Sequence, residues 1–191
     1  MLSGEGTPVL IHDETLERTT NGIGRVCDTP DAVLFSLDAG QGERVPRLSE
    51  AAALCEQLGL LANVEIKPAA GFEIPTGEVV ARFVAQHWTG CLPLLSSFSF
   101  EALQAARRVA PGVSRGLLFE AVPDDWRDYL RESGAITLHC DATRLPDTVL
   151  AEARAAGVPV LCYTVNDRHV ADALFARGVT SVFTDRLDLP G

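Results

Sequence analysis

From Leu48 onward the sequence alternates between extended and helical patterns, and this alternation limits the folds open to the chain more than any other feature. Six apolar segments have the pattern or length of strands, and one helical segment separates each from the next. Strands that alternate with helices at such short spacing form a parallel sheet, because each helix carries the chain back to the start of the next strand. The sequence therefore predicts an α/β protein.

The expected elements follow from hydrophobic period and from turn residues. Strands are expected at residues 62–67, 94–98, 114–119, 135–140, 159–165 and 181–185. Helices are expected at residues 51–58, 78–87, 100–109, 124–133, 146–156 and 167–177. Ser49 is predicted to cap the first helix and Gly59 to end it. Before Leu48, the pattern predicts a short strand at Thr7–Asp13, paired with Met1–Ser3 in a hairpin, and then a long loop up to Arg47.

Two parallel architectures compete, a closed (β/α)8 barrel and an open doubly wound sheet. The predicted strands end in polar residues, and in a barrel all such ends lie at one mouth, where active sites are built. A doubly wound sheet usually has a glycine-rich phosphate-binding turn after its first strand, which this sequence lacks. The barrel is favoured. Because a full barrel has eight strands and about 250 residues, we expect residues 1–191 to be a single partial barrel domain that lacks the first two strands and first helix.

One predicted strand, L-L-A-N-V-E-I-K-P at Leu61–Pro68, is unusual for a buried sheet. Side chains alternate along a strand, so Glu65 and Lys67 share the face opposite Ile66. Lys67 is the only lysine in the chain, and a lysine amine is a compact point charge. A solvated ion pair is the plain interpretation of this pattern. A site that opens on that face is the functional interpretation.

Charge and cysteine content exclude several classes of function. The formal net charge is −10, and beyond Arg107–Arg108 no basic cluster offers a nucleic-acid surface. No run of 18 apolar residues occurs, so stable membrane insertion is not expected, and the first residues do not resemble a signal peptide. The five cysteines are scattered and form no C-x-x-C pair, which indicates a reducing compartment and argues against a zinc site. We therefore expect a cytoplasmic protein.

Four segments carry a resemblance to a known family. They are P-V-L-I-H-D-E-T-L-E-R-T-T-N-G-I-G at Pro8–Gly24, V-E-I-K-P at Val64–Pro68, L-C-Y-T-V-N at Leu161–Asn166 and V-F-T-D-R at Val182–Arg186. In this order they resemble the glycerophosphodiester phosphodiesterase family. The first two segments identify the family strongly and the last two weakly. The resemblance implies a TIM barrel of the phospholipase-C-like phosphodiesterase type that hydrolyses glycerophosphodiesters to glycerol phosphate and an alcohol.

The resemblance also implies roles for four residues. His12, in the I-H-D motif, corresponds to one of two histidines that act as general acid and base. Glu65 corresponds to one ligand of a divalent cation, Mg²⁺ or Ca²⁺, and Lys67 to the lysine that faces the phosphate. Tyr163 corresponds to an aromatic residue near the substrate, although barrel packing explains a tyrosine there equally well. Oxygen ligands suit a hard cation, and a histidine can pass a proton to a leaving alkoxide.

The sequence departs from the family pattern at its start. The family's His-Arg-Gly and Glu-x-Asp segments, which carry the other histidine and two further metal ligands, are absent from the sequence. We therefore expect the chain to be inactive and marginally stable as it stands. Three alternatives stay open: a non-catalytic fragment or binding remnant, a homo-oligomer that borrows the missing strands from a partner, and a phosphoinositide or sphingolipid phospholipase on the same fold.

Overall fold

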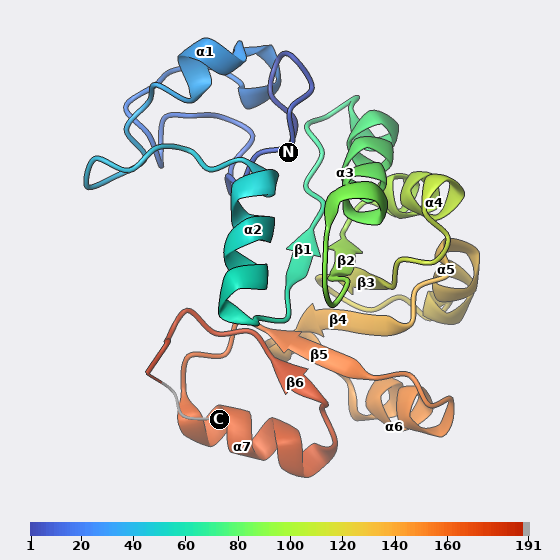
Figure 1. The fold of residues 1–191 in the computed structure, drawn as a ribbon. Helices are drawn as coiled ribbons and strands as arrows, with labels where there is room; N and C mark the ends of the chain where they lie inside the picture. The colour runs from blue at the N-terminus through green and yellow to red at the C-terminus, as the bar shows by residue number, and fades with distance from the viewer. Residues whose placement is uncertain (189–191) are drawn as a thin grey trace. The chain divides into compact units, whose positions relative to one another are not determined.

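The computed structural model describes residues 1–188, which divide between Ser114 and Arg115 into two compact units. Figure 1 follows the elements along the chain, from the N-terminal segment in blue to α7 and β6 in red. In each unit the strands are parallel neighbours and helices lie between them in the sequence. The predicted α/β class is therefore confirmed.

The first unit begins with an irregular segment and continues with two strands and three longer helices. The segment contains η1 (Val26–Asp28) and α1 (Asp31–Leu34). The later elements are α2 (Leu48–Leu58), β1 (Asn63–Glu65), α3 (Glu73–His87), β2 (Leu94–Ser97) and α4 (Phe100–Val109). β1 and β2 pair in parallel, with Glu65 directly opposite Ser96.

The second unit is a four-strand parallel repeat. Its elements are β3 (Arg115–Phe119), α5 (Trp126–Ser133), β4 (Thr137–Asp141), η2 (Ala142–Arg144), α6 (Asp147–Ala155), β5 (Val160–Tyr163), α7 (Arg168–Arg177) and β6 (Ser181–Val182). The strands pair in sequence order, and each pair is parallel. No helix within residues 1–188 has both the length and the apolar character needed to cross a bilayer.

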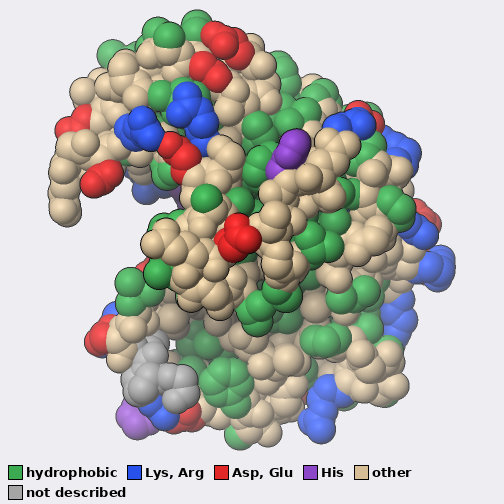
Figure 2. Space-filling view, viewed as in Figure 1, with side chains coloured by type: hydrophobic (Ala, Val, Ile, Leu, Met, Phe, Trp, Pro, Cys, Tyr) green, Lys and Arg blue, Asp and Glu red, His purple; other side chains and the backbone are tan. Residues whose placement is uncertain are grey.

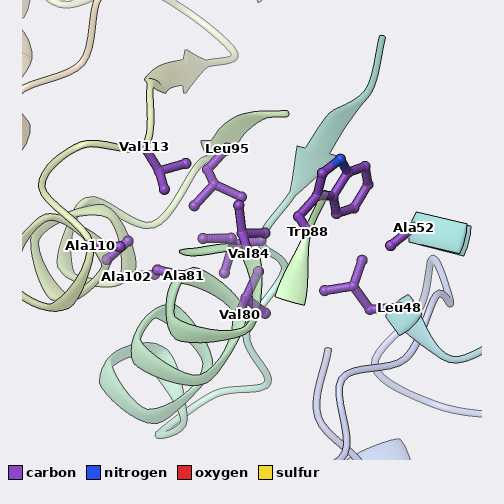
Figure 3. Packing of buried hydrophobic residues seen from close by; sticks show 12 residues of the cluster. Leu48, Ala52, Val80, Ala81, Val84, Trp88, Leu95, Ala102, Ala110 and Val113 are labelled. Carbon is purple, nitrogen blue, oxygen red and sulfur yellow. The ribbon is translucent and has the colours of Figure 1, made fainter. Parts of the chain in front are cut away.

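A core of small and branched side chains holds β1, β2 and three helices of the first unit together. Figure 3 shows Val80 and Val84 of α3 near Leu95 of β2, with Trp88 and Leu48 of α2 together on the right of this group. Most of these side chains are almost fully buried, which contributes about 1.5–3 kcal/mol for each large one. The core thereby fixes where β1 ends.

Two helix starts differ from the sequence prediction by three residues or more, and the other predicted starts differ by at most two. α3 starts at Glu73 rather than at residue 78, because Pro75 falls within the first turn, where its missing N–H costs no hydrogen bond. α2 starts at Leu48, so the prediction that Ser49 caps it is wrong. The side chain of Glu50 instead accepts the backbone N–H of Arg47 at 2.8 Å. Gly59 ends α2 with a φ of 64°, as predicted.

The segment of residues 1–47 is irregular, as predicted, but it has a core of its own. Val9, Leu16, Val26, Leu34 and Val45 are buried together there, whereas the strand predicted at residues 7–13 is reduced to single bridges. The predicted hairpin is confirmed by the antiparallel bridge between Leu2 and Pro8. Basic and acidic side chains are interspersed over this segment, at the top left of Figure 2, in agreement with its several exposed arginine–carboxylate pairs.

Candidate active site

The end of β1 directs two charged side chains toward the same space. Ile66, between Glu65 and Lys67, is 1% exposed. Its N–H donates to the carbonyl of Ser96 at 2.6 Å, and its carbonyl accepts the hydroxyl of Ser97 at 2.6 Å. Because side chains alternate along a strand, burial of Ile66 turns Glu65 and Lys67 to the opposite face.

The segment that carries His12 is tied to the start of α2. Val9 bridges Arg47, the N–H of Leu10 donates to the carbonyl of Pro46 at 2.9 Å, and the N–H of Leu48 donates to the carbonyl of Pro8 at 2.9 Å. This places Nε2 of His12 at 3.0 Å from Nζ of Lys67. The structure thus brings together two of the predicted site residues that lie 55 positions apart in the sequence.

Two contacts define the tautomer of the His12 imidazole. Nδ1 lies 2.7 Å from Oδ1 of Asp13, and a carboxylate can only accept. Nε2 faces the ammonium of Lys67, which can only donate. Both bonds form when Nδ1 carries the proton and Nε2 does not. Nη2 of Arg18 lies 3.2 Å from Nδ1 but, as a second donor, forms no hydrogen bond with it in this state.

Arg18 and Asp13 form an ion pair at the back of His12. Nη2 of Arg18 donates to Oδ1 of Asp13 at 2.7 Å, and Nε donates to Oδ2. The hydrogen bonds from Arg18, and then from His12, hold the pKa of the Asp13 carboxyl well below its usual value, so Asp13 is ionised near neutral pH. Our sequence reasoning missed both residues. Their signal was the aspartate of I-H-D and the arginine of E-R-T-T, both within the motif that identified His12.

A cavity of about 440 Å³ lies beside Glu65 and Lys67. Its lining includes Glu14, Glu65, Lys67, Glu73, Ser97 and Phe98. Oε1 of Glu65 is buried and accepts no hydrogen bond, although a carboxylate oxygen in a protein interior normally has a partner. A buried carboxylate oxygen of this kind is a candidate ligand for a hard cation.

Glu65 fits the role of one metal ligand but not of a complete metal site. Its unpartnered oxygen is the donor type that Mg²⁺ and Ca²⁺ prefer. Within residues 1–188, however, no three His, Cys, Asp or Glu side chains cluster closely enough to hold an ion. Ligands in addition to Glu65 would be required.

The N-terminal amine of Met1 is a further titratable group close to Glu65 and Lys67. It donates to the carbonyl of Val9 at 3.1 Å. Burial, and then the charge of Lys67, lowers its pKa to about 6, while Glu65 opposes the shift. The amine is therefore largely neutral near pH 7, and Lys67 is the main cation beside Glu65.

Tyr163, the predicted substrate-binding residue, lies on β5 in the second unit. Its hydroxyl donates to the carbonyl of Phe119 at 2.9 Å, and its side chain is half-buried. The contact joins β5 to the end of β3, which a packing residue would also do. The role of Tyr163 stays a prediction.

The second unit also buries a histidine, His139, on β4. Its side chain has no exposure, Nε2 lies 2.9 Å from the hydroxyl of Thr137, and Nδ1 has no partner. Burial lowers the pKa of His139 to about 4. The imidazole is therefore neutral in the folded protein at pH 7.

We expect His139 to make the protein less stable in acid. Protonation favours the unfolded chain, where the pKa of a histidine is about 6.5, so this stability is complete above that value and is lost as pH falls toward about 4. Between these two pH values the free energy of unfolding should fall by about 3 kcal/mol. Urea unfolding at about pH 7.5 and pH 4 should show a smaller loss for His139→Gln than for wild type. His169→Gln, at an exposed histidine of α7, should keep the wild-type loss, and equal losses in all three proteins would refute the assignment.

Comparison with known proteins identifies the family. The sequence profile of the glycerophosphoryl diester phosphodiesterase family matches residues 2–189. The chain belongs to this family. A glycerophosphodiester phosphodiesterase of Caldanaerobacter subterraneus subsp. tengcongensis is 29% identical over 192 residues, which are 96% of this chain and 79% of that protein. The predicted resemblance is confirmed, and the family is one of phosphoric diester hydrolases.

Solved structures of glycerophosphodiester phosphodiesterases and related proteins share the fold. A phosphodiesterase of Oleispira antarctica, solved in complex with the product sn-glycerol-3-phosphate, is 38% identical with a TM-score of 0.92. The match covers 97% of this chain and 78% of that one. A protein of Silicibacter pomeroyi described as a glycerophosphoryl diester phosphodiesterase is 21% identical, with a TM-score of 0.85 over 97% of this chain and 77% of that one, and this likeness shows the fold alone.

Proposed function

We propose that the site of His12, Glu65 and Lys67 hydrolyses glycerophosphodiesters to glycerol phosphate and an alcohol with the help of Mg²⁺ or Ca²⁺, on the family's (β/α)8 barrel. The observation that carries the proposal is the 3.0 Å contact between Nζ of Lys67 and Nε2 of His12 beside the orphaned oxygen of Glu65. An ammonium and an unprotonated imidazole nitrogen are thereby held at one cavity, a second one of about 350 Å³ that His12, Glu65 and Lys67 all line. A phosphodiester needs both, because it is an anion whose reaction moves a proton.

Lys67 binds the substrate in this proposal. Its ammonium has three donors. When the substrate binds, the ammonium exchanges its contact with the His12 imidazole for a hydrogen bond to a phosphate oxygen. A divalent cation, when bound, offsets the negative charge that gathers on the phosphate oxygens. Glu65 supplies one carboxylate oxygen to hold that cation. Preorganised positive groups of this kind stabilise the transition state more than the ground state.

His12 moves the proton. Once Lys67 has turned to the phosphate, Nε2 accepts the proton of the glycerol hydroxyl next to the phosphorus. The hydroxyl oxygen bonds to phosphorus, the bond from phosphorus to the alcohol oxygen breaks, and the leaving oxygen takes up a proton from water to become the alcohol. The hydroxide so formed then adds to phosphorus and opens the cyclic phosphate, and the imidazolium returns its proton to the glycerol oxygen that is released. Asp13 accepts the Nδ1–H throughout and stabilises the imidazolium that forms.

The 191-residue chain by itself is expected to be inactive, because within residues 1–188 no three His, Cys, Asp or Glu side chains cluster to hold a hard cation, which needs several oxygen ligands. The same chain extended at its N-terminus by a segment with the His-Arg-Gly and Glu-x-Asp motifs is expected to hydrolyse glycerophosphocholine when Mg²⁺ or Ca²⁺ is added. The assay measures glycerol phosphate release. Metal-dependent hydrolysis by the unextended chain would contradict the expectation of inactivity, and an inactive, folded extended protein would contradict the proposed function.

Two controls sharpen this assay. A substrate analogue without the hydroxyl next to the phosphorus should not react, and equal rates for both substrates would exclude the cyclic phosphate route. If the unextended chain gains activity only as a discrete oligomer, a partner supplies the missing groups. If it binds the diester without hydrolysis, it is the binding remnant that the incomplete ligand set favours.

The proposed partner is therefore a small glycerophosphodiester, and the proposed location is the cytoplasm. The state of the cysteines supports a reducing compartment, because all five are free thiols. Cys140 and Cys162 lie directly opposite each other on β4 and β5, with their sulfur atoms 4.0 Å apart, and are not bonded.

A further inference from the structure

We infer that Arg18 is a positioning residue which, through Asp13, holds the His12 imidazole in the tautomer with a proton on Nδ1 and none on Nε2. This inference deepens the proposed function, and the catalytic role that it gives to Arg18 rests on that function. The geometric part concerns the free protein and can be tested without activity. Three contacts carry it: Arg18 to Asp13, Asp13 to His12, and His12 to Lys67.

The Arg18 guanidinium fixes the carboxylate of Asp13 in two directions. Nη2 donates to Oδ1 at 2.7 Å and Nε donates to Oδ2, so each oxygen has one donor from the same planar group. Two parallel bonds set the plane of the carboxylate as well as its position. Oδ1 thereby stays 2.7 Å from Nδ1 of His12, which is exposed and has few other neighbours to orient it.

The R-T-T-N-G segment explains how Arg18 reaches this position. The Thr20 hydroxyl donates to the carbonyl of Leu16 at 2.7 Å and accepts the N–H of Gly22 at 3.0 Å. Asn21 exchanges two bonds with Asp38, each 3.0 Å long. The side chains of Thr20 and Asn21 therefore stabilise a turn. Arg18 takes no part in these bonds and extends to Asp13.

Stability alone gives no reason for this ion pair. The side chains of Arg18 and Asp13 are 60% and 26% exposed, and exposed pairs contribute only about 0–1 kcal/mol. A lysine would supply the same charge without the fork that orients both oxygens. The orientation of the Asp13 carboxylate, rather than the charge of the pair, is therefore what acts on His12.

The test measures the His12 tautomer directly. Long-range ¹H–¹⁵N spectra of the imidazole nitrogens are recorded for the whole chain at about pH 8.5, where an ordinary histidine is neutral, and His12 is assigned from the spectrum of His12→Gln. Wild type should show a protonated Nδ1 and a bare Nε2. Arg18→Gln should lower the ratio of the Nδ1–H to the Nε2–H tautomer roughly tenfold, as expected for loss of one oriented hydrogen bond.

Matched variants separate positioning from folding. Arg44→Gln removes another exposed arginine–carboxylate pair, with Glu50, that does not touch His12, and it should leave the tautomer ratio at the wild-type value. Arg18→Lys keeps the charge and serves if Arg18→Gln does not fold; it too should lower the ratio. A wild-type ratio in either folded Arg18 variant would overturn the inference. Failure of the extended protein to hydrolyse diesters would refute the proposed function and leave the tautomer result unaffected.

Discussion

Replacing His12 by glutamine is expected to lower kcat/KM for glycerophosphocholine by about 10²–10⁴-fold in the N-terminally extended protein, the usual cost of losing a general acid–base residue. Glutamine retains hydrogen-bonding groups at similar length, but it cannot carry the proton that Nε2 accepts. Because His12 is exposed and lies outside the cores, its replacement should not change the free energy of unfolding by more than about 0.5 kcal/mol. The measurements are steady-state hydrolysis and urea unfolding of the same preparation.

The control for this variant is His87→Gln. His87 ends α3, is exposed, and belongs to the same unit, so its replacement changes one histidine without touching the site. Its kcat/KM should equal that of the parent protein. An active His12→Gln protein, with loss confined to His87→Gln, would show that proton transfer takes place elsewhere.

Replacing Gly77 by alanine should have the largest effect on stability of any single change proposed for this chain. Gly77 lies in α3 where the helix crosses α4, and a Cβ there would lie 2.2 Å from the carbonyl oxygen of Ala102 and 2.9 Å from its Cα. These are backbone atoms, so no side-chain rotation relieves the overlap. We expect a loss of about 3 kcal/mol or more, at the upper end of overpacking costs. Urea unfolding measures it.

Gly112→Ala supplies the matched comparison. An added Cβ at Gly112 would meet no atom within 4 Å. Its free energy of unfolding should stay within about 0.5 kcal/mol of wild type. If the two alanine variants were equally stable, the close approach of α3 to α4 would not exist in solution. A selective loss at Gly77 would confirm the packing that holds β1, and with it Glu65, in place.

Local sequence signals were sufficient for the repeat of strands and helices. α4 starts at Phe100 and Gly59 ends α2, both as predicted. The Ser99 side chain, which our sequence reasoning did not single out, caps α4, and both signals act within one turn. The start of α3 was not predictable in the same way. A proline such as Pro75 predicts the end of a helix when only the sequence is considered, but within the first turn of a helix it is tolerated. The buried cluster around Leu16 and Val26 also has no linear period, because irregular segments place their apolar residues by tertiary contact.

The sequence by itself determined the class of fold, the family motifs and the pair Glu65 and Lys67 on one face of a strand, because side-chain alternation and turn chemistry act over a few residues. Only the tertiary structure decided that Lys67 faces Nε2 of His12, that Asp13 and Arg18 stand behind Nδ1, and that one oxygen of Glu65 has no partner. The physical reason is distance along the chain. A hydrogen bond between residues 55 positions apart depends on how β1, α2 and the N-terminal segment pack, and no local pattern records that packing.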